Sequence, residues 1–268
     1  MSVGAAPACA ITIAGSDSGG GAGIQADLKT FAALGVHGLS AITAITAQNT
    51  RRVSAIHPVP LKHLRAQLDA LFEDFPIAAA KTGMLGDAKT TRCVARELAN
   101  RKPAWLVADP VMIATSGARL LDRDAIRVLR DELIPLADVL TPNLPEAEAL
   151  LGIKIRIARD AERAAQALLD LGARAVLLKG GHARGREVLD LFADARGTLE
   201  FRHPRLNIQA HGTGCTLSAA LAGYLAKGTA PRTAARQATH FVQRALRGSF
   251  RPGGGDLHVL RHRWGNSE

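Results

Sequence analysis

Short apolar runs alternate with longer amphipathic segments along most of the chain, and this alternation limits the fold more than any other feature. Runs such as Ala10–Ala14 and Trp105–Ala108 have the length of buried strands, and glycine or aspartate follows them. Between such runs, apolar residues recur three and four apart, as Leu61, Leu64 and Leu68 do, which is typical of amphipathic helices. Strands joined through helices pair in parallel, so the sequence predicts a mostly parallel sheet with helices on both faces.

The pattern predicts one doubly wound α/β domain over residues 1–268, with a short antiparallel hairpin at one edge of the sheet. The expected strands are Ala10–Ala14, Leu39–Ala47, Ile77–Ala80, Trp105–Ala108, Val139–Leu140 and Ala175–Leu178, with the hairpin formed by Val188–Phe192 and Thr198–Phe201. The expected helices are Ala22–Leu34, Leu61–Phe72, Thr90–Asn100, Asp122–Leu133, Pro145–Leu151, Asp160–Leu171, Gly214–Ala226 and Arg232–Arg247.

The charge balance raises one competing function, nucleic-acid binding. The chain has 34 Lys+Arg against 24 Asp+Glu, a net charge of +10. Its basic residues are scattered, and aromatics make up 4%, too few for base-stacking platforms, so solvated helix faces are the favoured interpretation. The chain has three cysteines without a CxxC pair and no signal-peptide pattern, which predicts a cytoplasmic protein. It has no long apolar segment, so no membrane partner is expected, and the scattered charges predict no nucleic-acid partner.

Four loops follow the expected parallel strands, at the sheet edge where such folds bind ligands. They are Gly15–Gly23, Lys81–Met84, Asp109–Val111 and Thr141–Glu146. The first contains G-x-G-x-x-A, a dinucleotide fingerprint, but no acidic residue lies between Asp27 and Asp69 to hold a ribose. The P-loop motif is also absent, so nicotinamide enzymes and P-loop kinases are both disfavoured.

A later segment, His211–Ala220, places glycines around Thr213 directly before a small-residue helix. Unpaired backbone N–H groups and the helix dipole favour an anion there, and Gly212 and Gly214 would let it approach closely. The same field predicts a lowered pKa for the thiol of Cys215. Tight packing of a small-residue helix with an inert thiol is the alternative, and these residues alone favour neither.

Two further places have a functional and a structural interpretation. Asn143 and Glu146 put an amide and a carboxylate three apart at the end of a strand, which suits a hydrated magnesium ion but equally a helix start. Lys179 ends a strand before two glycines, where its ammonium could meet a polyphosphate.

In these loops and in further stretches the chain resembles a known family, the hydroxymethylpyrimidine/phosphomethylpyrimidine kinases of thiamine biosynthesis, within the ribokinase-like superfamily. The matching stretches run in order from about residue 10 to 222 and are Ala14–Thr30, Ala47–Thr50, Lys81–Leu85, Asp109–Met112, Thr141–Glu146, Lys179–His182 and His211–Ala220. The resemblance implies ATP-dependent phosphorylation of 4-amino-5-hydroxymethyl-2-methylpyrimidine and of its monophosphate, with ATP and Mg²⁺ as cofactors.

The resemblance also implies a role for each matching residue. Gln48 would recognise the aminopyrimidine, because a carboxamide offers a donor beside an acceptor. The remaining roles are pocket walls at Gly15, Met84 and Val111, an anion hole at Gly212, Thr213 and Gly214, a catalytic Cys215, ATP-phosphate and metal-water partners at Lys179 and Asp109, and a magnesium shell at Asn143 and Glu146. Whether Cys215 must act as a base stays open, since phosphoryl transfer depends more on positioning and charge neutralisation.

Three expectations stay open. A pyridoxal kinase of the same fold is the alternative activity, because some relatives accept both rings. A homodimer is compatible with the sequence but not required by it. Gly248–Gly255 departs from the glycine-histidine-glycine stretch expected there, which leaves the role of the last 20 residues undefined.

Overall fold

The computed structural model describes residues 6–113, 120–181 and 185–262, so His182 of the Lys179–His182 stretch lies outside the described residues. Its strands are β1 (Cys9–Ala14), β2 (His37–Ile42), β3 (Ala44–Gln48), β4 (Val53–Pro58), β5 (Ile77–Thr82), β6 (Trp105–Ala108), β7 (Val139–Leu140), β8 (Ala175–Leu178), β9 (Glu187–Asp194), β10 (Gly197–Pro204), β11 (Ala210–His211) and β12 (His258–Val259). Its helices are α1 (Gly23–Ala33), α2 (Leu61–Asp74), α3 (Ala88–Arg101), α4 (Arg123–Val128), α5 (Leu144–Leu151), α6 (Ala158–Asp170), α7 (Thr213–Ala226) and α8 (Pro231–Arg247).

The main sheet has eight strands in the order β10-β9-β8-β7-β6-β5-β1-β2. Six neighbouring strands of this sheet, β8, β7, β6, β5, β1 and β2, are parallel. Strand β9 pairs antiparallel with both β8 and β10. The mostly parallel sheet with an antiparallel edge hairpin is therefore confirmed. The chain leaves β1 for β2 at one side and returns to β5 at the other, so the strand order changes direction at β1.

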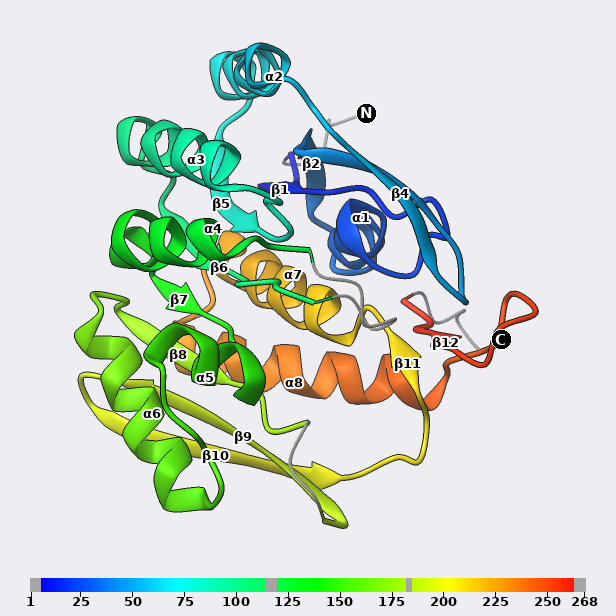
Figure 1. Cartoon of the computed structure of the whole chain (residues 1–268), viewed down its shortest axis with the longest axis vertical. Coiled ribbons are helices and arrows are strands. Elements are labelled where there is room, and N and C mark those ends of the chain that lie inside the picture. Colours follow the sequence, from blue (N-terminus) through cyan, green and yellow to red (C-terminus); the bar gives the residue numbers. More distant parts are fainter. Residues whose placement is uncertain (1–5, 114–119, 182–184, 263–268) are drawn as a thin grey trace.

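Helices cover both faces of this sheet, as Figure 1 shows, with α1, α7 and α8 on one face and α2 to α6 on the other. The face under α7 is packed with small and apolar side chains, and Phe31, Phe192 and Phe241 are almost fully buried there. The opposite face buries leucines of the outer helices, such as Leu64, Leu68 and Leu168. Sequence periodicity located these faces because each helix buries one apolar stripe.

Local signals fix several helix ends. Asp87 and Asp122 each accept a hydrogen bond from the backbone three residues on, which caps α3 and α4. The helix expected over Asp122–Leu133 begins as α4 and continues as a π-helical turn, Leu129–Leu133. Gly152, with φ +68°, ends α5 in the left-handed conformation that glycine adopts most readily.

One expected strand was wrong. The run Leu39–Ala47 forms two strands, because Thr43 N donates to Ala14 O and Thr43 Oγ1 donates to Met84 O, which takes the chain out of the main sheet. Beyond this corner β3 pairs antiparallel with β4, a strand the sequence did not predict because most of its side chains are exposed. The β3–β4 hairpin rises beside α1 in Figure 1 and carries Gln48 at its end.

No helix of the described residues is long and apolar enough to cross a membrane.

Candidate active site

A pocket of about 540 Å³ opens at the carboxyl ends of the parallel strands. Loops that follow β1, β5, β6, β7 and β8 meet there with the end of β3 and the start of α7. Its lining includes all twelve residues predicted from the sequence, namely Gly15, Gln48, Met84, Asp109, Val111, Asn143, Glu146, Lys179, Gly212, Thr213, Gly214 and Cys215. The strand order reverses at β1 beside this pocket, the position where open α/β sheets bind ligands.

Gly15 and Met84 lie side by side at one end of the pocket. A Cβ at position 15 would lie 3.0 Å from Met84 Sδ, so a side chain there would have to displace the methionine. Gly15 N also donates to Met84 O at 3.1 Å, which holds the loops after β1 and β5 together. With Gln48 as a polar wall, this end has the shape and chemistry for a flat ring with polar edge atoms.

The other end is formed by the first turn of α7. Gly212 has φ +81°, and a Cβ there would lie 1.9 Å from the carbonyl oxygen of Gly21, so only glycine fits. A Cβ on Gly214 would lie 3.2 Å from Lys179 Nζ, which shows how closely the lysine faces the helix start. Backbone N–H groups of a first helical turn have no partner within the helix, so this end suits an anion.

Three charged side chains lie beside the helix start. Lys179 Nζ is 2.9 Å from Asp109 Oδ1 and 3.9 Å from Glu146 Oε2. Burial opposes the charge on Asp109, but the ammonium groups of Lys179 and Lys81 outweigh burial and lower the pKa of Asp109. Burial raises the pKa of Glu146 to about 7, and the nearby carboxylate of Asp109 adds to the rise. The group therefore combines one ammonium with two carboxyl groups whose pKa values are shifted in opposite directions.

The helix interpretation of Asn143 and Glu146 is the one the geometry bears out. Asn143 Oδ1 accepts from Glu146 N, and Glu146 Oε2 accepts from Asn143 N, each at 2.8 Å, which is a capping box at the start of α5. Among the described residues, no three or more histidine, cysteine, aspartate or glutamate side chains form a group that could hold a metal ion. Their use by magnesium remains a prediction.

The prediction of a lowered pKa for Cys215 was wrong. Burial raises the pKa of the thiol to about 11, and the carboxylates of Asp27 and Asp109 act in the same direction. The ammonium of Lys81 and the N–H of Gly23 oppose this rise but do not cancel it. The helix start favours a thiolate, yet the loss of hydration is the larger effect for this half-buried thiol, which lies beside the start of α1 at Gly23.

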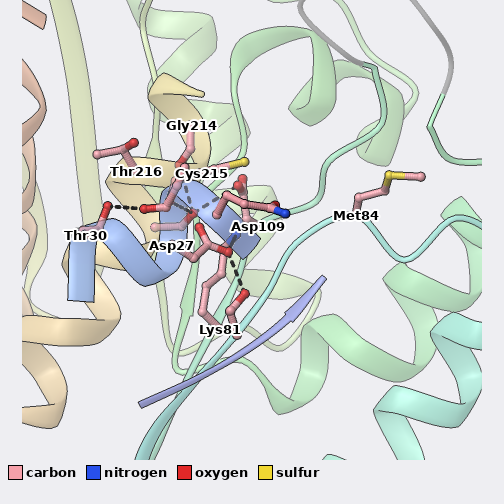
Figure 2. Close-up of polar contacts among 12 residues, drawn as sticks. Asp27, Thr30, Lys81, Met84, Asp109, Gly214, Cys215 and Thr216 are labelled. Carbon is pink, nitrogen blue, oxygen red and sulfur yellow. Dashed lines mark hydrogen bonds and ion pairs between the residues drawn. The ribbon is translucent and has the colours of Figure 1, made fainter. Parts of the chain in front are cut away.

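Sequence reasoning also missed an ion pair beneath the pocket. Lys81 Nζ lies 2.8 Å from Asp27 Oδ2, and both side chains are fully buried. Thr12 Oγ1 donates to the same carboxylate oxygen at 2.6 Å. Figure 2 shows this pair beneath Cys215 and the first turn of α7. Burial favours the neutral form of Lys81, but Asp27, Cys215 and Asp109 together outweigh it, so the pKa of Lys81 is raised and the lysine is charged. Burial also raises the pKa of Asp27, which Lys81 and Thr12 oppose. A lysine within the apolar run Ile77–Thr82 was the available signal.

Comparison with known proteins decides what this pocket belongs to. The phosphomethylpyrimidine kinase family model matches residues 17–260. The chain belongs to this family. Phosphomethylpyrimidine kinases transfer phosphate, so the chain is an enzyme of the kinase class, and a basic nucleic-acid-binding protein is no longer a competing identification.

Relatives of the phosphomethylpyrimidine kinase family agree in sequence and in fold. A hydroxymethylpyrimidine/phosphomethylpyrimidine kinase of Haemophilus influenzae is 52% identical over 242 residues, which cover 88% of this chain and 90% of the relative. A phosphomethylpyrimidine kinase structure from Clostridium difficile has 43% identity and a TM-score of 0.80, with coverage of 89% and 99%. The pyridoxal kinase of Staphylococcus aureus, solved with AMP-PCP and pyridoxal, has 32% identity and a TM-score of 0.89, with coverage of 96% and 94%.

Two more buried polar residues in this phosphomethylpyrimidine kinase line the pocket without having been predicted. Asp17 and His211 come from the glycine-rich loop after β1 and from β11, and their side chains lie 3.1 Å apart. Both belong to stretches that carry the family resemblance, so the sequence marked their segments but not their contact. Their separation of 194 positions in the chain hides the contact from any local pattern.

Proposed function

We propose that the chain phosphorylates 4-amino-5-hydroxymethyl-2-methylpyrimidine and then its monophosphate, with ATP as the phosphoryl donor. One observation carries the proposal: a single pocket is lined both by the carboxamide of Gln48 and by the start of α7 with Lys179, which suits an anion. The relatives' names supply the identity of the ring.

Gln48 is assigned to the polar edge of the pyrimidine. Its carboxamide has both a donor and an acceptor, which complement a ring nitrogen beside an exocyclic amine. Gly15, Met84 and Val111 are assigned to the walls of the ring site, where the lack of a side chain at Gly15 leaves space beside Met84 Sδ. This assignment places the hydroxymethyl group towards the start of α7.

In the transfer step the substrate hydroxyl oxygen attacks the γ-phosphorus of ATP, the new O–P bond forms, and the bond to the ADP oxygen breaks. Gly212, Thr213 and Gly214 are assigned to the transferring group, because backbone N–H groups there stabilise the charge on its oxygens. Lys179 is assigned to the ATP phosphates, and Asp109 holds its ammonium at 2.9 Å. The second transfer uses a phosphate oxygen of the monophosphate as the nucleophile.

Cys215 is assigned to a hydrogen bond with the substrate hydroxyl, whose proton passes to an oxygen of the transferred phosphoryl group as the O–P bond forms. A thiol with a pKa of about 11 is protonated at neutral pH, so in the free enzyme it is a neutral hydrogen-bond partner rather than a ready base. Phosphoryl transfer tolerates this, because bond cleavage to ADP runs ahead of proton loss in a loose transition state. The contribution of Cys215 is therefore proposed to be modest.

Magnesium is proposed to bind with the ATP phosphates. The donor set fits an ion held mainly through water and phosphate oxygens, because Glu146 and Asp109 offer carboxylates but no cluster of three ligands exists among the described residues. The oxygen of Asn143 already accepts a hydrogen bond at the helix start, so we propose for it a contact through water only. The ion would neutralise phosphate charge during the transfer.

The proposal extends to the whole chain as one catalytic domain that works in the cytoplasm, where three cysteines without a disulfide remain reduced. A homodimer stays a proposal, with the face of the β3–β4 hairpin that carries Ile45, which is 54% exposed, as its candidate interface. Light scattering of the purified enzyme tests the dimer. Pyridoxal is retained as a weaker second substrate because the pyridoxal kinase fold matches over nearly the whole chain.

A coupled assay of ADP release tests the function. The pyrimidine, its monophosphate, pyridoxal and ribose are compared at equal concentrations, and the highest kcat/KM is expected for the two pyrimidines. Turnover of pyridoxal with none of either pyrimidine would overturn the proposal in favour of the second activity. An absence of ADP release with all four compounds would overturn both.

A further inference from the structure

The glycine-rich loop after β1, which resembles a dinucleotide fingerprint in sequence, is folded around a side chain of its own. The buried carboxylate of Asp17 accepts backbone hydrogen bonds from Gly19, Gly21 and Ala22, at 2.8, 2.9 and 2.7 Å. Burial acts against the charge, but hydrogen bonds from His211 and the loop outweigh it and lower the pKa of Asp17. Asp17 is therefore an ionised and rigidly held acceptor inside the pocket wall.

The same loop fixes the main chain of Gln48. The hydroxyl of Ser18 donates to Gln48 O at 2.8 Å and accepts from Gln48 N at 2.7 Å. These two bonds join the loop to the end of β3, 30 residues away in the chain. Only the side-chain torsions of Gln48 remain to be set.

His211 sets them. Its Nε2 lies 3.1 Å from Asp17 Oδ2 and 2.8 Å from the terminal amide of Gln48, whose nitrogen occupies the near position. An ionised carboxylate only accepts, so the ring nitrogen that faces Asp17 carries its hydrogen. A nitrogen that carries a hydrogen cannot accept one from the amide. A half-turn of the amide places Oε1 at the same point, where it shares the Nε2 hydrogen with Asp17 Oδ2 in a bifurcated hydrogen bond.

We propose that His211, held by Asp17, fixes the orientation of the Gln48 carboxamide with its oxygen towards the imidazole, and so determines which ring the enzyme accepts. This rests on the proposed function, in which Gln48 contacts the ring. A fixed amide presents its donor and acceptor to the substrate in one order only. It accepts a ring nitrogen beside an amino group and rejects a ring N–H beside a carbonyl, in which donor and acceptor are exchanged.

The test compares the 4-amino substrate with its 4-oxo analogue, which has the same size and the reversed order of donor and acceptor. Kinetics and calorimetric binding are measured for the wild type and for His211→Phe, His211→Gln and His203→Phe. His203 is the matched control, since its Nε2 lies 3.1 Å from Asp190 Oδ2, the same contact outside the pocket lining. His211→Gln can restore an N–H close to the position of Nε2.

We expect the preference for the 4-amino ring, as the ratio of kcat/KM values, to fall by about 10-fold or more in His211→Phe, because the amide can then turn. His211→Gln should recover part of the ratio, and His203→Phe should keep it. A ratio unchanged in folded His211→Phe would overturn the role of His211. If the wild-type enzyme binds the 4-amino ring in preference to the 4-oxo ring but does not phosphorylate it, the proposed function alone is overturned. If the enzyme binds neither ring, both the proposed function and the role of His211 are overturned.

A second measurement does not depend on a variant that folds. Two-bond ¹H–¹⁵N NMR spectra of the wild-type enzyme show which imidazole nitrogens carry hydrogen. The proposal requires a protonated Nε2 on His211 in the enzyme without substrate. An Nε2 without hydrogen would make the imidazole an acceptor from Gln48, which reverses the amide and overturns the proposal.

Discussion

The ionisation of Cys215 separates two accounts of catalysis, and it can be measured directly. Burial raises the pKa of this thiol to about 11, against an ordinary value of 9.0. The thiolate fraction at neutral pH is therefore about 100-fold lower than for an exposed cysteine. Because the thiolate is the nucleophile towards iodoacetamide, alkylation of Cys215 should be slow at neutral pH and should accelerate as the pH rises towards 11.

The assay measures the rate of alkylation at each cysteine by peptide mass spectrometry, between about pH 7 and about pH 10.5. The pH dependence of the rate is compared, rather than the rate itself, because access to a half-buried thiol changes the rate at every pH. Unfolded protein in urea is the control, in which Cys215 should titrate near the ordinary value of 9.0. A midpoint for Cys215 below about pH 8 in the folded enzyme would refute the argument that burial outweighs the helix field.

The kinetic consequence is equally specific. With a neutral thiol at neutral pH, Cys215→Ser should keep kcat within about 10-fold of the wild type, because positioning and charge neutralisation carry the transfer. A loss of about 100-fold or more would be the signature of a general base. That result would require bound substrates to lower the pKa of the thiol, and alkylation in the presence of a non-hydrolysable ATP analogue would then accelerate.

Three further substitutions test other parts of the site. Gln48→Leu leaves the polar edge of the ring unpaired, so kcat/KM for the pyrimidine should fall by about 10-fold or more, with a smaller loss for pyridoxal; equal losses would remove Gln48 from recognition. Gly214→Val adds a side chain where a Cβ would already lie 3.2 Å from Lys179 Nζ, so kcat should fall to a small fraction of the wild-type value. The circular-dichroism melting curve should stay close to wild type, and normal turnover would contradict the anion site. Lys81→Met removes the cation from the buried carboxylate of Asp27 and leaves it only the hydroxyl of Thr12, so the free energy of unfolding in urea should fall by about 3–5 kcal/mol. The double variant with Asp27→Leu should recover most of this loss, and a loss below about 1 kcal/mol in the single variant would contradict the ionic pair.

Much of the architecture could be predicted because its signals are local. Short continuous apolar runs placed five of the six parallel strands and part of the sixth, β2, and period-3.6 patterns placed the eight α-helices of the described residues. Parallel pairing brought the loops after the strands to one edge. Trp105–Ala108, Val139–Leu140 and Ala175–Leu178 end where expected, at the residues that begin the site loops. The predicted site residues line one pocket because consecutive parallel strands all present their carboxyl ends to it.

What the sequence by itself determined was therefore the sheet, its helices and the residues gathered at one edge. The tertiary structure alone decided the electrostatics of that edge: the burial that raises the pKa of Cys215, the pair of Lys81 with Asp27 across 54 residues, and the contact of His211 with Asp17 across 194. The physical reason is that apolar periodicity is written along one segment, whereas loss of hydration and the partner of a buried charge depend on segments distant in the chain. A helix start that would ionise a thiol in water leaves it neutral once other parts of the chain exclude that water.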